Sequence, residues 1–169
     1  MFQERSVQDL TMNPFEKVNK QWMLITAGDE KGFNTMTASW GGLGVIWQKP
    51  VATVYLRPQR YTKEFVDKNE YFTVSFYGEA HRKALQLCGT LSGRDTDKTA
   101  QAGLTPYFVD GTAAFAEAEL ILVCRKLYQQ ELRPELFTDA GLEQAMYPEK
   151  DYHTMYIGEI VKVLQKQGA

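Results

Sequence analysis

Two arginines precede a predicted helix start, in the segment Arg57-Pro58-Gln59-Arg60-Tyr61-Thr62. Guanidinium groups bind phosphate oxygens through paired hydrogen bonds, and backbone amides at the start of a helix also favour an anion. The chemistry that this segment could perform is therefore the binding of a phosphate group. Arginines beside a surface turn are also common, so the segment alone fits a solvated loop equally well.

A second cationic segment could also contribute to phosphate binding. Ser92-Gly93-Arg94-Asp95-Thr96-Asp97-Lys98 combines a flexible turn, two cations and another helix start. By itself it also fits a capped helix with mixed surface charge. If a phosphate ligand exists, we expect this segment to contribute to its site.

A third segment, Asn34-Thr35-Met36-Thr37-Ala38-Ser39-Trp40, carries hydroxyl groups at alternate positions. In a strand, Thr35, Thr37 and Ser39 would point to one face and form a row of hydrogen-bonding groups. Threonine is also frequent in strands because it suits a pleated surface, so this segment alone favours an ordinary strand. A ligand-binding role needs support from the rest of the chain.

Short runs of apolar and β-branched residues, separated by turns, predict a series of strands. A glycine-punctuated loop, Gly41-Gly42-Leu43-Gly44, is expected before the third strand, and the dipeptide Asp110-Gly111 indicates a tight hairpin turn. The run that starts at Ala116 exceeds ordinary strand length, so we expect a bulge or bend in it. The expected strands are Trp22–Ala27, Asn34–Trp40, Val51–Leu56, Tyr71–Phe76, Tyr107–Val109, a strand from Thr112, Ala116–Leu132 and Tyr152–Leu164.

Three short helices are expected between these strands. The first covers Thr62–Lys68 with Thr62 as its N-cap, and the second covers Ala80–Leu87 and ends near Gly89. The third runs from an Asp95 cap through Ala102, with Gly103 as its stop. The fold class is thus mainly β with short helices, and the number of strands suggests a closed antiparallel barrel. A doubly wound parallel sheet would need regular strand–helix alternation and a glycine-rich dinucleotide turn, which this sequence lacks.

Composition limits the function classes. A chain of 169 residues with 44% hydrophobic content and no linker or repeat predicts one domain over residues 1–169. The net charge is 19 minus 21, or −2, which argues against nucleic-acid or anionic-membrane partners. A polar N-terminus and the lack of a long apolar run predict a cytoplasmic protein. Cys88 and Cys124 are expected to be buried and reduced, and no Cys/His cluster predicts a metal site.

Taken together and in order, these segments resemble the flavin reductase-like group of FMN-binding split barrels. The resemblance runs from about Trp22 to Ile160, and rests on the Asn34 to Gly41 segment, Lys49-Pro50-Val51, the segment from Arg57 to Thr62, and Ser92-Gly93-Arg94-Asp95. It implies an antiparallel, Greek-key-like split β-barrel, a homodimer, and FMN held near the subunit boundary.

The resemblance also implies roles for individual residues. The strand formed by Asn34, Thr35, Met36, Thr37, Ala38, Ser39 and Trp40 would line the isoalloxazine ring and the ribityl chain. Arg57, Arg60, Tyr61 and Thr62 would hold the phosphate region, while Ser92, Arg94 and Lys98 would close the site. Arginine forks and amides at a helix start suit a phosphate that carries up to two negative charges.

A last similarity concerns the segment from Asp151 to Ile160. It is similar to the family's Gly-Asp-His, which is followed four residues later by Gly-x-Val, and the histidine of that motif is associated with nicotinamide binding. Here Tyr152 separates Asp151 from His153, and Ile160 takes the place of valine. The resemblance makes His153 the candidate catalytic residue, whereas a lone histidine in a strand is usually structural.

The resemblance therefore predicts an oxidoreductase in which NADH or NADPH passes hydride to FMN, and the reduced flavin passes electrons to a small-molecule or protein acceptor. The redox chemistry would belong to the cofactor, and the protein would position and tune it. Two alternatives remain: a flavin-binding electron carrier or sensor, similar to flavoredoxin, without efficient nicotinamide turnover, and a barrel of the same ancestry that binds another ligand, such as haem, or none.

Overall fold

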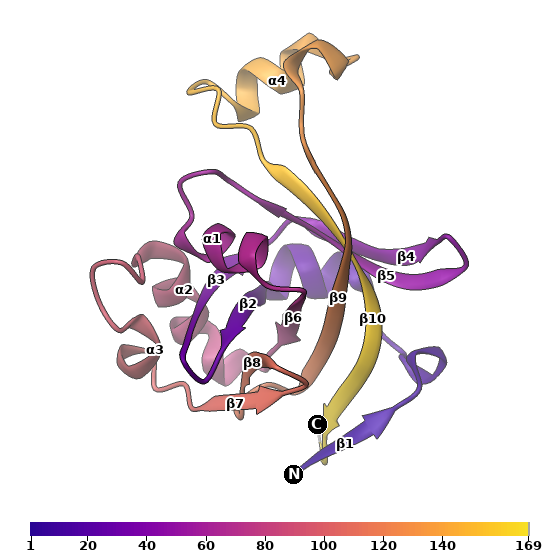
Figure 1. The fold of residues 1–169 in the computed structure, drawn as a ribbon, viewed down its shortest axis with the longest axis vertical. Coiled ribbons are helices and arrows are strands. Elements are labelled where there is room, and N and C mark those ends of the chain that lie inside the picture. Colours follow the sequence, from indigo (N-terminus) through magenta and orange to yellow (C-terminus); the bar gives the residue numbers. More distant parts are fainter. Residues whose placement is uncertain (169) are drawn as a thin grey trace.

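A curved antiparallel sheet of eight strands forms the body of the protein in the computed structural model, which describes residues 1–168 (Figure 1). Seven strands follow the order β3-β2-β6-β9-β10-β5-β4, β1 pairs with β10, and β7 and β8 form a separate hairpin. The strands are β1 Phe2–Arg5, β2 Met23–Asp29, β3 Gly32–Ala38, β4 Gly41–Ile46, β5 Lys49–Leu56, β6 Tyr71–Phe76, β7 Pro106–Val109, β8 Thr112–Phe115, β9 Leu120–Glu131 and β10 Thr154–Lys166. The predicted mainly β fold with antiparallel pairing is confirmed.

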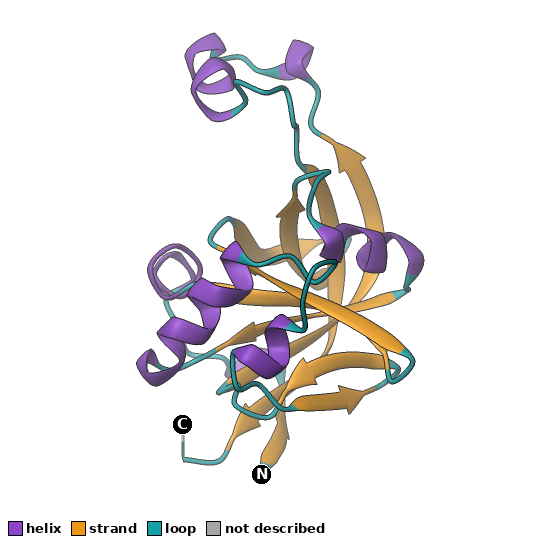
Figure 2. Ribbon diagram, turned by 90° about the vertical axis from the view of Figure 1, so that its left-hand side faces the viewer, coloured by secondary structure: helices purple, strands orange, loops and turns teal. Residues whose placement is uncertain are grey.

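Helices fill the connections. They are the 3-10 or π turns η1 Val7–Asp9, η2 Glu16–Gln21, η3 Glu79–His81 and η4 Pro134–Leu136, and the α-helices α1 Tyr61–Lys68, α2 Arg82–Thr90, α3 Lys98–Gln101 and α4 Ala140–Met146. The helices α1 and α2 both pack against β2 and β3, and α3 adjoins α2 (Figures 1 and 2). Val66 of α1 clusters with Ile25 of β2, whereas Leu85 of α2 clusters with Leu24, so α1 and α2 cover opposite faces of the hairpin.

The two predicted hairpins form as expected. β2 pairs with β3 in a register that sets Thr26 opposite Thr35, although β3 ends at Ala38 and leaves Ser39 and Trp40 outside it. β7 pairs with β8 across Asp110 and Gly111, whose φ angles of 49° and 75° are those that a tight hairpin turn requires.

The segment from Gly41 to Gly44 is a strand, and the predicted loop there was wrong. It belongs to β4, which pairs with β5 along its whole length. The turn between them is made by Trp47 and Gln48, both with positive φ (53° and 58°), as a two-residue hairpin turn requires. Glycine is a weak strand former, but a partner strand offers hydrogen bonds that outweigh this preference.

The expected helix caps also need correction. The helix α1 begins at Tyr61 with Arg60 at its N-cap position, so Thr62 lies inside the first turn and caps nothing. The helix α3 is capped by Asp97, which accepts a hydrogen bond from the amide of Ala100 at 3.0 Å, whereas Asp95 lies outside the helix. The helix α2 continues through Gly89 to Thr90.

β9 and β10 form a long two-stranded ribbon at the centre of the sheet. The predicted irregularity is present, because Leu127 of β9 has no opposite residue between the pairs Tyr128–Ile157 and Lys126–Gly158. A second shift leaves out Val161 of β10. β9 starts at Leu120, four residues after the expected start, because the chain first turns around Ala118, whose amide donates to the Phe115 carbonyl.

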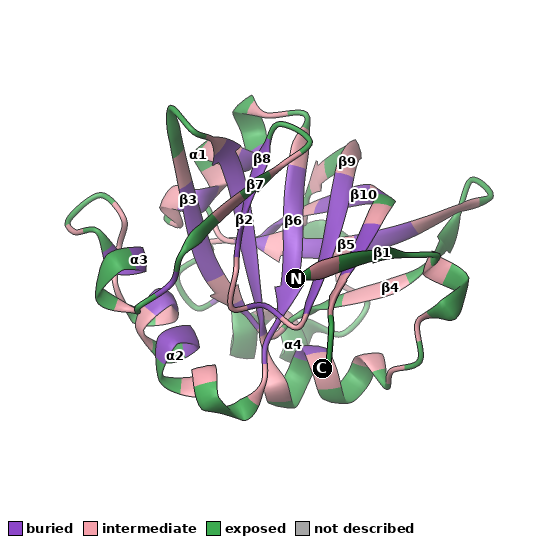
Figure 3. Ribbon diagram, turned by 90° about the horizontal axis from the view of Figure 1, so that it is seen from below, coloured by how far each residue is buried: buried purple, intermediate pink, exposed green. Residues whose placement is uncertain are grey.

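Two groups of buried side chains form the core, inside the curved sheet and between the sheet and α2 (Figure 3). Cys124 belongs to the first and Cys88 to the second, and both are free thiols, as expected. Burial raises the pKa of Cys88 to about 11 and also raises that of Cys124, so both stay protonated at neutral pH.

Between β9 and β10 the chain leaves the barrel and forms a small lobe, residues 132–153, which contains η4 and α4 and stands away from the body of the molecule (Figure 1). The sequence patterns gave no indication of this lobe. Leu136 and Leu142 lie on its surface and are 63% and 48% exposed.

In residues 1–168 no helix has the length and apolar character needed to cross a membrane. Over the same range, no three His, Cys, Asp or Glu side chains come together in a group that could hold a metal ion.

The centre of the sheet depends on the small size of Gly158. A Cβ there would lie 2.6 Å from Cζ of Phe72 and 2.9 Å from Cβ of Cys124. We predict that Gly158→Ala lowers the free energy of unfolding by about 1–3 kcal/mol, because core overpacking costs this much. Gly44→Ala is the matched control, since nothing lies within 4 Å of its Cβ position. Urea denaturation measures both, and equal midpoints would contradict the close contact.

Candidate functional site

A cleft of about 380 Å³ opens where the end of β3, the end of β5 and the start of β10 meet. A smaller recess of about 80 Å³ adjoins it and shares Met36, Gln59 and Arg60 with it. The cleft is lined by Met36, Thr37, Ala38, Ser39, Trp40, Tyr55, Arg57, Gln59, Arg60 and His153. The recess is lined by Met36, Gln59, Arg60, Tyr61, Thr62, Thr90, Leu91, Ser92, Gly93 and Lys98. The fold thus brings residues from the three sequence segments and His153 to one elongated site.

The cleft forms the wide end of the site and the recess its narrow end. His153 lies at the wide end and is only 7% exposed. Its ring packs against Trp40, with 5.1 Å between the ring centroids, and against Tyr55 at 6.5 Å. The Tyr147 hydroxyl lies 2.8 Å from its Nδ1 atom. Burial, and after it the positive charge of Arg57, lower the pKa of His153 to about 4.

These contacts set the protonation of the histidine. Because its pKa is about 4, His153 is neutral at pH 7 and carries one ring hydrogen. Burial raises the pKa of Tyr147, so its hydroxyl remains protonated. We assign Tyr147 as the donor to Nδ1, which leaves the ring hydrogen on Nε2. His153 then serves as a hydrogen-bond donor in the cleft.

Arg57 lies at the same end as His153. Its Nη1 atom is 2.5 Å from Oδ2 of Asp151, its Nη2 atom donates to the Met146 carbonyl at 3.0 Å, and its guanidinium stacks over the Tyr147 ring at 5.2 Å. Gln59 donates to the same carboxylate oxygen at 2.8 Å. Hydrogen bonds from Gln59 and Arg57 lower the pKa of Asp151, which therefore stays ionised and neutralises Arg57.

The narrow end, formed by the recess, holds the positive charge of Lys98, which within residues 1–168 has no carboxylate partner such as Asp151 provides for Arg57. Lys98 is 4% exposed, and its Nζ atom donates to the carbonyls of Cys88 and Leu91, each at 3.1 Å. Among the described residues no carboxylate forms an ion pair with it. Burial lowers the pKa of Lys98 to about 8. A buried ammonium bound only by carbonyls favours an anion beside it.

Arg60 lies between the two ends. Its Nη1 atom donates to the Gly89 carbonyl at 2.9 Å, and its Nη2 atom lies 3.5 Å from the Thr37 carbonyl. Burial lowers the pKa of Arg60, with a further contribution from Arg57, but a guanidinium in a protein remains charged. It therefore joins α2 to β3 and also lines both cavities.

The predicted row of hydroxyls is divided between two roles. The Thr35 hydroxyl is fully buried, 2.8 Å from that of Thr26, and donates to the Ile25 carbonyl, so it holds the β2–β3 hairpin and does not line the cleft. Thr37 donates to the Leu85 carbonyl from the cleft wall. Asn34 also lies behind the cleft, where its side chain donates to the Thr62 hydroxyl at 2.8 Å.

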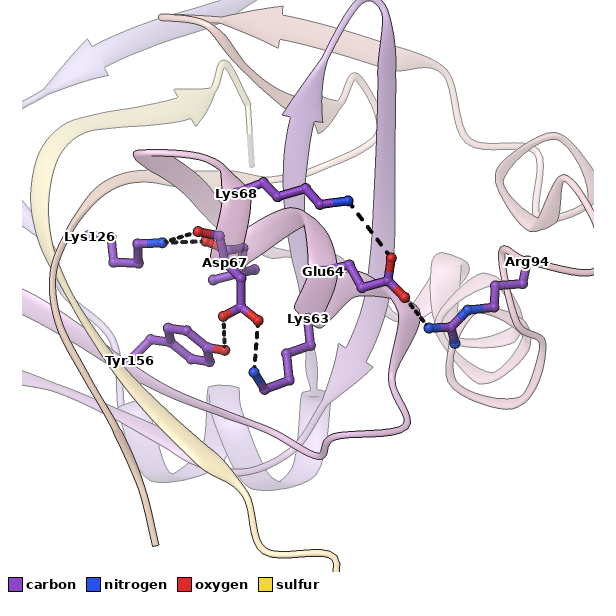
Figure 4. Close-up of polar contacts among 8 residues, drawn as sticks. Lys63, Glu64, Asp67, Lys68, Arg94, Lys126 and Tyr156 are labelled. Atoms are coloured by element: carbon purple, nitrogen blue, oxygen red, sulfur yellow. Dashed lines mark hydrogen bonds and ion pairs between the residues drawn. The ribbon is translucent and has the colours of Figure 1, made fainter.

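Arg94 lies outside the cleft and the recess. Its guanidinium forms an ion pair with Glu64 and stacks over the Tyr61 ring at 4.6 Å (Figure 4). The site residues that were not predicted from the sequence are Tyr55, Gln59 and Tyr147 at the cleft and Thr90, Leu91 and Gly93 at the recess. Gln59 stands between the two arginines and could have been included, and Tyr55 follows from strand alternation. Tyr147 comes from the lobe, for which the sequence carries no pattern.

The fold and the site together define a class. The fold is the antiparallel split barrel that is found in flavin reductase-like FMN-binding proteins. A family model described as "flavin reductase like domain" matches residues 15–169, and the chain belongs to this family. Among curated protein sequences, none matches the chain significantly.

Several solved structures share this fold. An FMN-binding domain of a flavin reductases-like enzyme from Shewanella baltica has a TM-score of 0.69 and 18% identity, over 98% of this chain and 77% of that chain. Flavoredoxin of Desulfovibrio vulgaris has a TM-score of 0.69 and 23% identity, over 98% and 78%. An FMN-binding protein from Thermus thermophilus, bound to 1-cyclohex-2-enone, has a TM-score of 0.68 and 20% identity, over 97% and 82%. At these identities the similarity shows the fold.

The environment of His153 predicts a pH dependence. In the unfolded chain a histidine binds a proton near pH 6.5, whereas folded His153 does so only near pH 4. The unfolded state therefore binds more protons between these values, and stability falls as the pH drops from about 6.5 towards 4. Arg57→Met should raise the pKa of His153, because a nearby positive charge is lost. NMR titration of the ring measures this, with Arg94→Met as the control; an unchanged pKa in Arg57→Met would contradict the coupling.

Proposed function

We propose that this chain is an FMN-binding oxidoreductase that accepts hydride from NADH or NADPH and passes electrons to a small-molecule or protein acceptor. The observation that carries the proposal is the difference between the two ends of the site. The wide end has an aromatic wall and a neutral histidine, and the narrow end holds the buried ammonium of Lys98. This arrangement suits a long ligand with a flat ring at one end and a phosphate at the other.

The residues present fit FMN at both ends. The recess around Lys98 is small enough to select a phosphate group and too small for a ring, and it also contains Ser92 and the start of α1. The cleft offers Met36, Trp40 and Tyr55 as apolar surface for the isoalloxazine ring. When bound, FMN supplies a ring that takes up a hydride and releases electrons. The names of the similar structures, which include FMN-binding proteins and flavoredoxin, support this choice of ligand.

The chain's own residues position the reactants. Neutral His153 can donate its Nε2 hydrogen to a carbonyl oxygen of a flavin or of a nicotinamide amide, because Tyr147 fixes the ring from the other side. The nicotinamide would enter through the open side of the cleft. Trp40 lies at that side and is 42% exposed.

We also propose that the protein forms a homodimer. The cleft opens to solvent, and the nearby lobe exposes Leu136 and Leu142, which a second subunit would cover. Light scattering of the FMN-loaded protein tests this proposal, and the mass of a single chain would contradict it.

The similar flavoredoxins favour a second function, an electron carrier without efficient nicotinamide turnover. Anaerobic stopped-flow measurement of flavin bleaching by NADH and NADPH distinguishes the two. We predict bleaching that rises with nicotinamide concentration and slows about tenfold or more in His153→Phe, while His153→Gln keeps much of the rate because its amide can replace the Nε2 donor. Reduction by dithionite is the control and should be equal in all three proteins. No bleaching of the wild type by either nucleotide would favour the carrier.

The two ends of the site predict different effects on ligand affinity. Lys98→Met should weaken FMN more than riboflavin, by on the order of ten- to a hundredfold, because a charge-assisted contact with the phosphate is lost. Arg57→Met should change the affinity for both ligands equally, since Arg57 lies at the His153 end and is neutralised by Asp151. Fluorescence titration of the two flavins measures both effects. Equal weakening of FMN and riboflavin by Lys98→Met would place the phosphate elsewhere.

A further inference from the structure

Asn34 of β3 lies behind the recess and holds one of the residues that line it. Its Nδ2 atom donates to the Thr62 hydroxyl, in the first turn of α1, at 2.8 Å. Asn34 is 5% exposed and does not line the recess itself, whereas Thr62 does. The hydrogen bond therefore reaches the wall of the recess from behind, where no ligand in the recess touches Asn34.

The surroundings of Asn34 fix which end of its amide meets Thr62. The Nδ2 atom also lies 3.4 Å from the Thr35 carbonyl, which can only accept hydrogen bonds. A turned amide would place Oδ1 against this carbonyl, oxygen against oxygen, so the hydrogen-bond network assigns the orientation. Asn34 also packs so closely against Gly93 that a Cβ atom there would collide with Oδ1. Asn34 is therefore the donor, and the Thr62 hydroxyl oxygen is the acceptor.

This direction decides what the recess offers to a ligand. A hydroxyl that accepts one hydrogen bond keeps its own hydrogen for another partner, and within the described part of the chain the Thr62 hydrogen has no acceptor. Ser92 is oriented in the same way, because its Oγ atom accepts from the Arg94 amide at 3.2 Å. The hydroxyl of Thr90, which also lines the recess, instead donates to two carbonyls of its own helix. Thr62 and Ser92 thus join Lys98 as donors to the recess.

We propose that Asn34 is a positioning residue that makes the recess selective for a phosphate group. By donating to Thr62, it keeps the Thr62 hydrogen available to a phosphate oxygen, and a hydrogen bond to an ionised oxygen is stronger than one to a neutral hydroxyl. The inference rests on the proposed function, because the recess must hold the phosphate of FMN. It adds a residue that acts through Thr62 and never contacts the ligand.

The test is the ratio of the riboflavin Kd to the FMN Kd, measured by fluorescence titration of the flavin-free protein. Asn34→Leu should lower this ratio several-fold, because the Thr62 hydroxyl loses its fixed direction. Asn34→Asp has nearly the same shape and should lower the ratio about tenfold or more, since a carboxylate accepts the Thr62 hydrogen and turns it away from the phosphate. The riboflavin affinity, which both variants should retain, shows that the site is folded.

Thr26→Val is the matched control. It removes another buried side-chain contact of the same hairpin, the 2.8 Å contact with the Thr35 hydroxyl, away from the recess. The ratio of the two dissociation constants should stay at the wild-type value.

A double-variant cycle separates positioning from a structural role. Thr62→Val leaves no hydroxyl to orient, so adding Asn34→Leu to it should not lower the ratio further. An equal fall in the ratio with and without the Thr62 hydroxyl would show that Asn34 acts by another route and would overturn the inference.

The remaining outcomes distinguish this inference from the proposed function. A wild type that binds neither flavin, or that binds both equally, contradicts the proposed phosphate site and the inference together. A preference for FMN that is lost in Lys98→Met and Thr62→Val but kept in both Asn34 variants leaves the phosphate site in place and overturns the inference alone.

Discussion

The pairing of β10 with its neighbours is the constraint on which the rest of the structure depends. β10 hydrogen-bonds to β9 on one side and to β5 on the other, and its far end also pairs with β1. In this register Thr154 lies opposite Leu56, so His153 and Arg57 become neighbours although they are far apart in the sequence. The ribbon can pack at this density because Gly158 leaves room for Phe72. The wide end of the cleft is thus a consequence of strand register.

The two ends of the site differ in how far their positive charges are neutralised, and this difference favours one orientation of an anionic ligand. The charge of Arg57 is offset by its ion pair with Asp151. Lys98 at the other end has only carbonyl partners, and these partially charged oxygens do not cancel a full positive charge. A ligand with one anionic end therefore binds in one orientation. In the proposed flavin complex the neutral ring would lie beside the neutral histidine and the phosphate beside the ammonium.

Much of the fold was predictable from sequence because local patterns and tertiary pairing agree there. The β2–β3 hairpin and β6 follow from their alternation and turn residues, and Asp110-Gly111 has the backbone that its turn requires. The strand β4 was missed because its glycines signal a loop, and only the partner strand β5 stabilises it. The caps at Thr62 and Asp95 were misplaced by two residues. Near α3 both Asp95 and Asp97 could accept an amide hydrogen bond, whereas α1 begins after Arg60 without any side-chain cap.

The site, like the fold, was predictable from the sequence only where local patterns determine it. The segments that line it were found from residue types, but the partner of each charge is set by long-range contacts. Nothing in the sequence shows that Arg57 meets Asp151, or that the lobe brings Tyr147 to His153. Likewise the row of hydroxyls was expected on one face, yet burial assigns Thr35 to the hairpin with Thr26. Sequence patterns predict which chemistry is available, whereas packing decides which groups remain open to a ligand.

The helix α1 begins directly after the arginine segment and lines the recess with Tyr61 and Thr62, so its attachment explains how that segment is held. At its C-terminal end, Lys126 of β9 donates to the carbonyls of Val66 and Asp67 (Figure 4). Tyr156 of β10 donates to the Asp67 carboxylate at 2.6 Å, and Lys63 to its other oxygen at 2.8 Å. Burial would raise the pKa of Asp67, but these hydrogen bonds outweigh it and lower the pKa.

The same central ribbon therefore fixes both sides of the cleft. Tyr156 of β10 stands three residues after His153, which directly precedes this strand, so the strand that follows the histidine also anchors α1. The segment from Arg57 to Arg60 is held between β5, which pairs with β10, and α1, which is bonded to it. Its backbone has little freedom to move, because Arg60 is also tied to Gly89 of α2. The distance between the neutral end and the charged end of the site is thus set by the barrel, before any ligand binds.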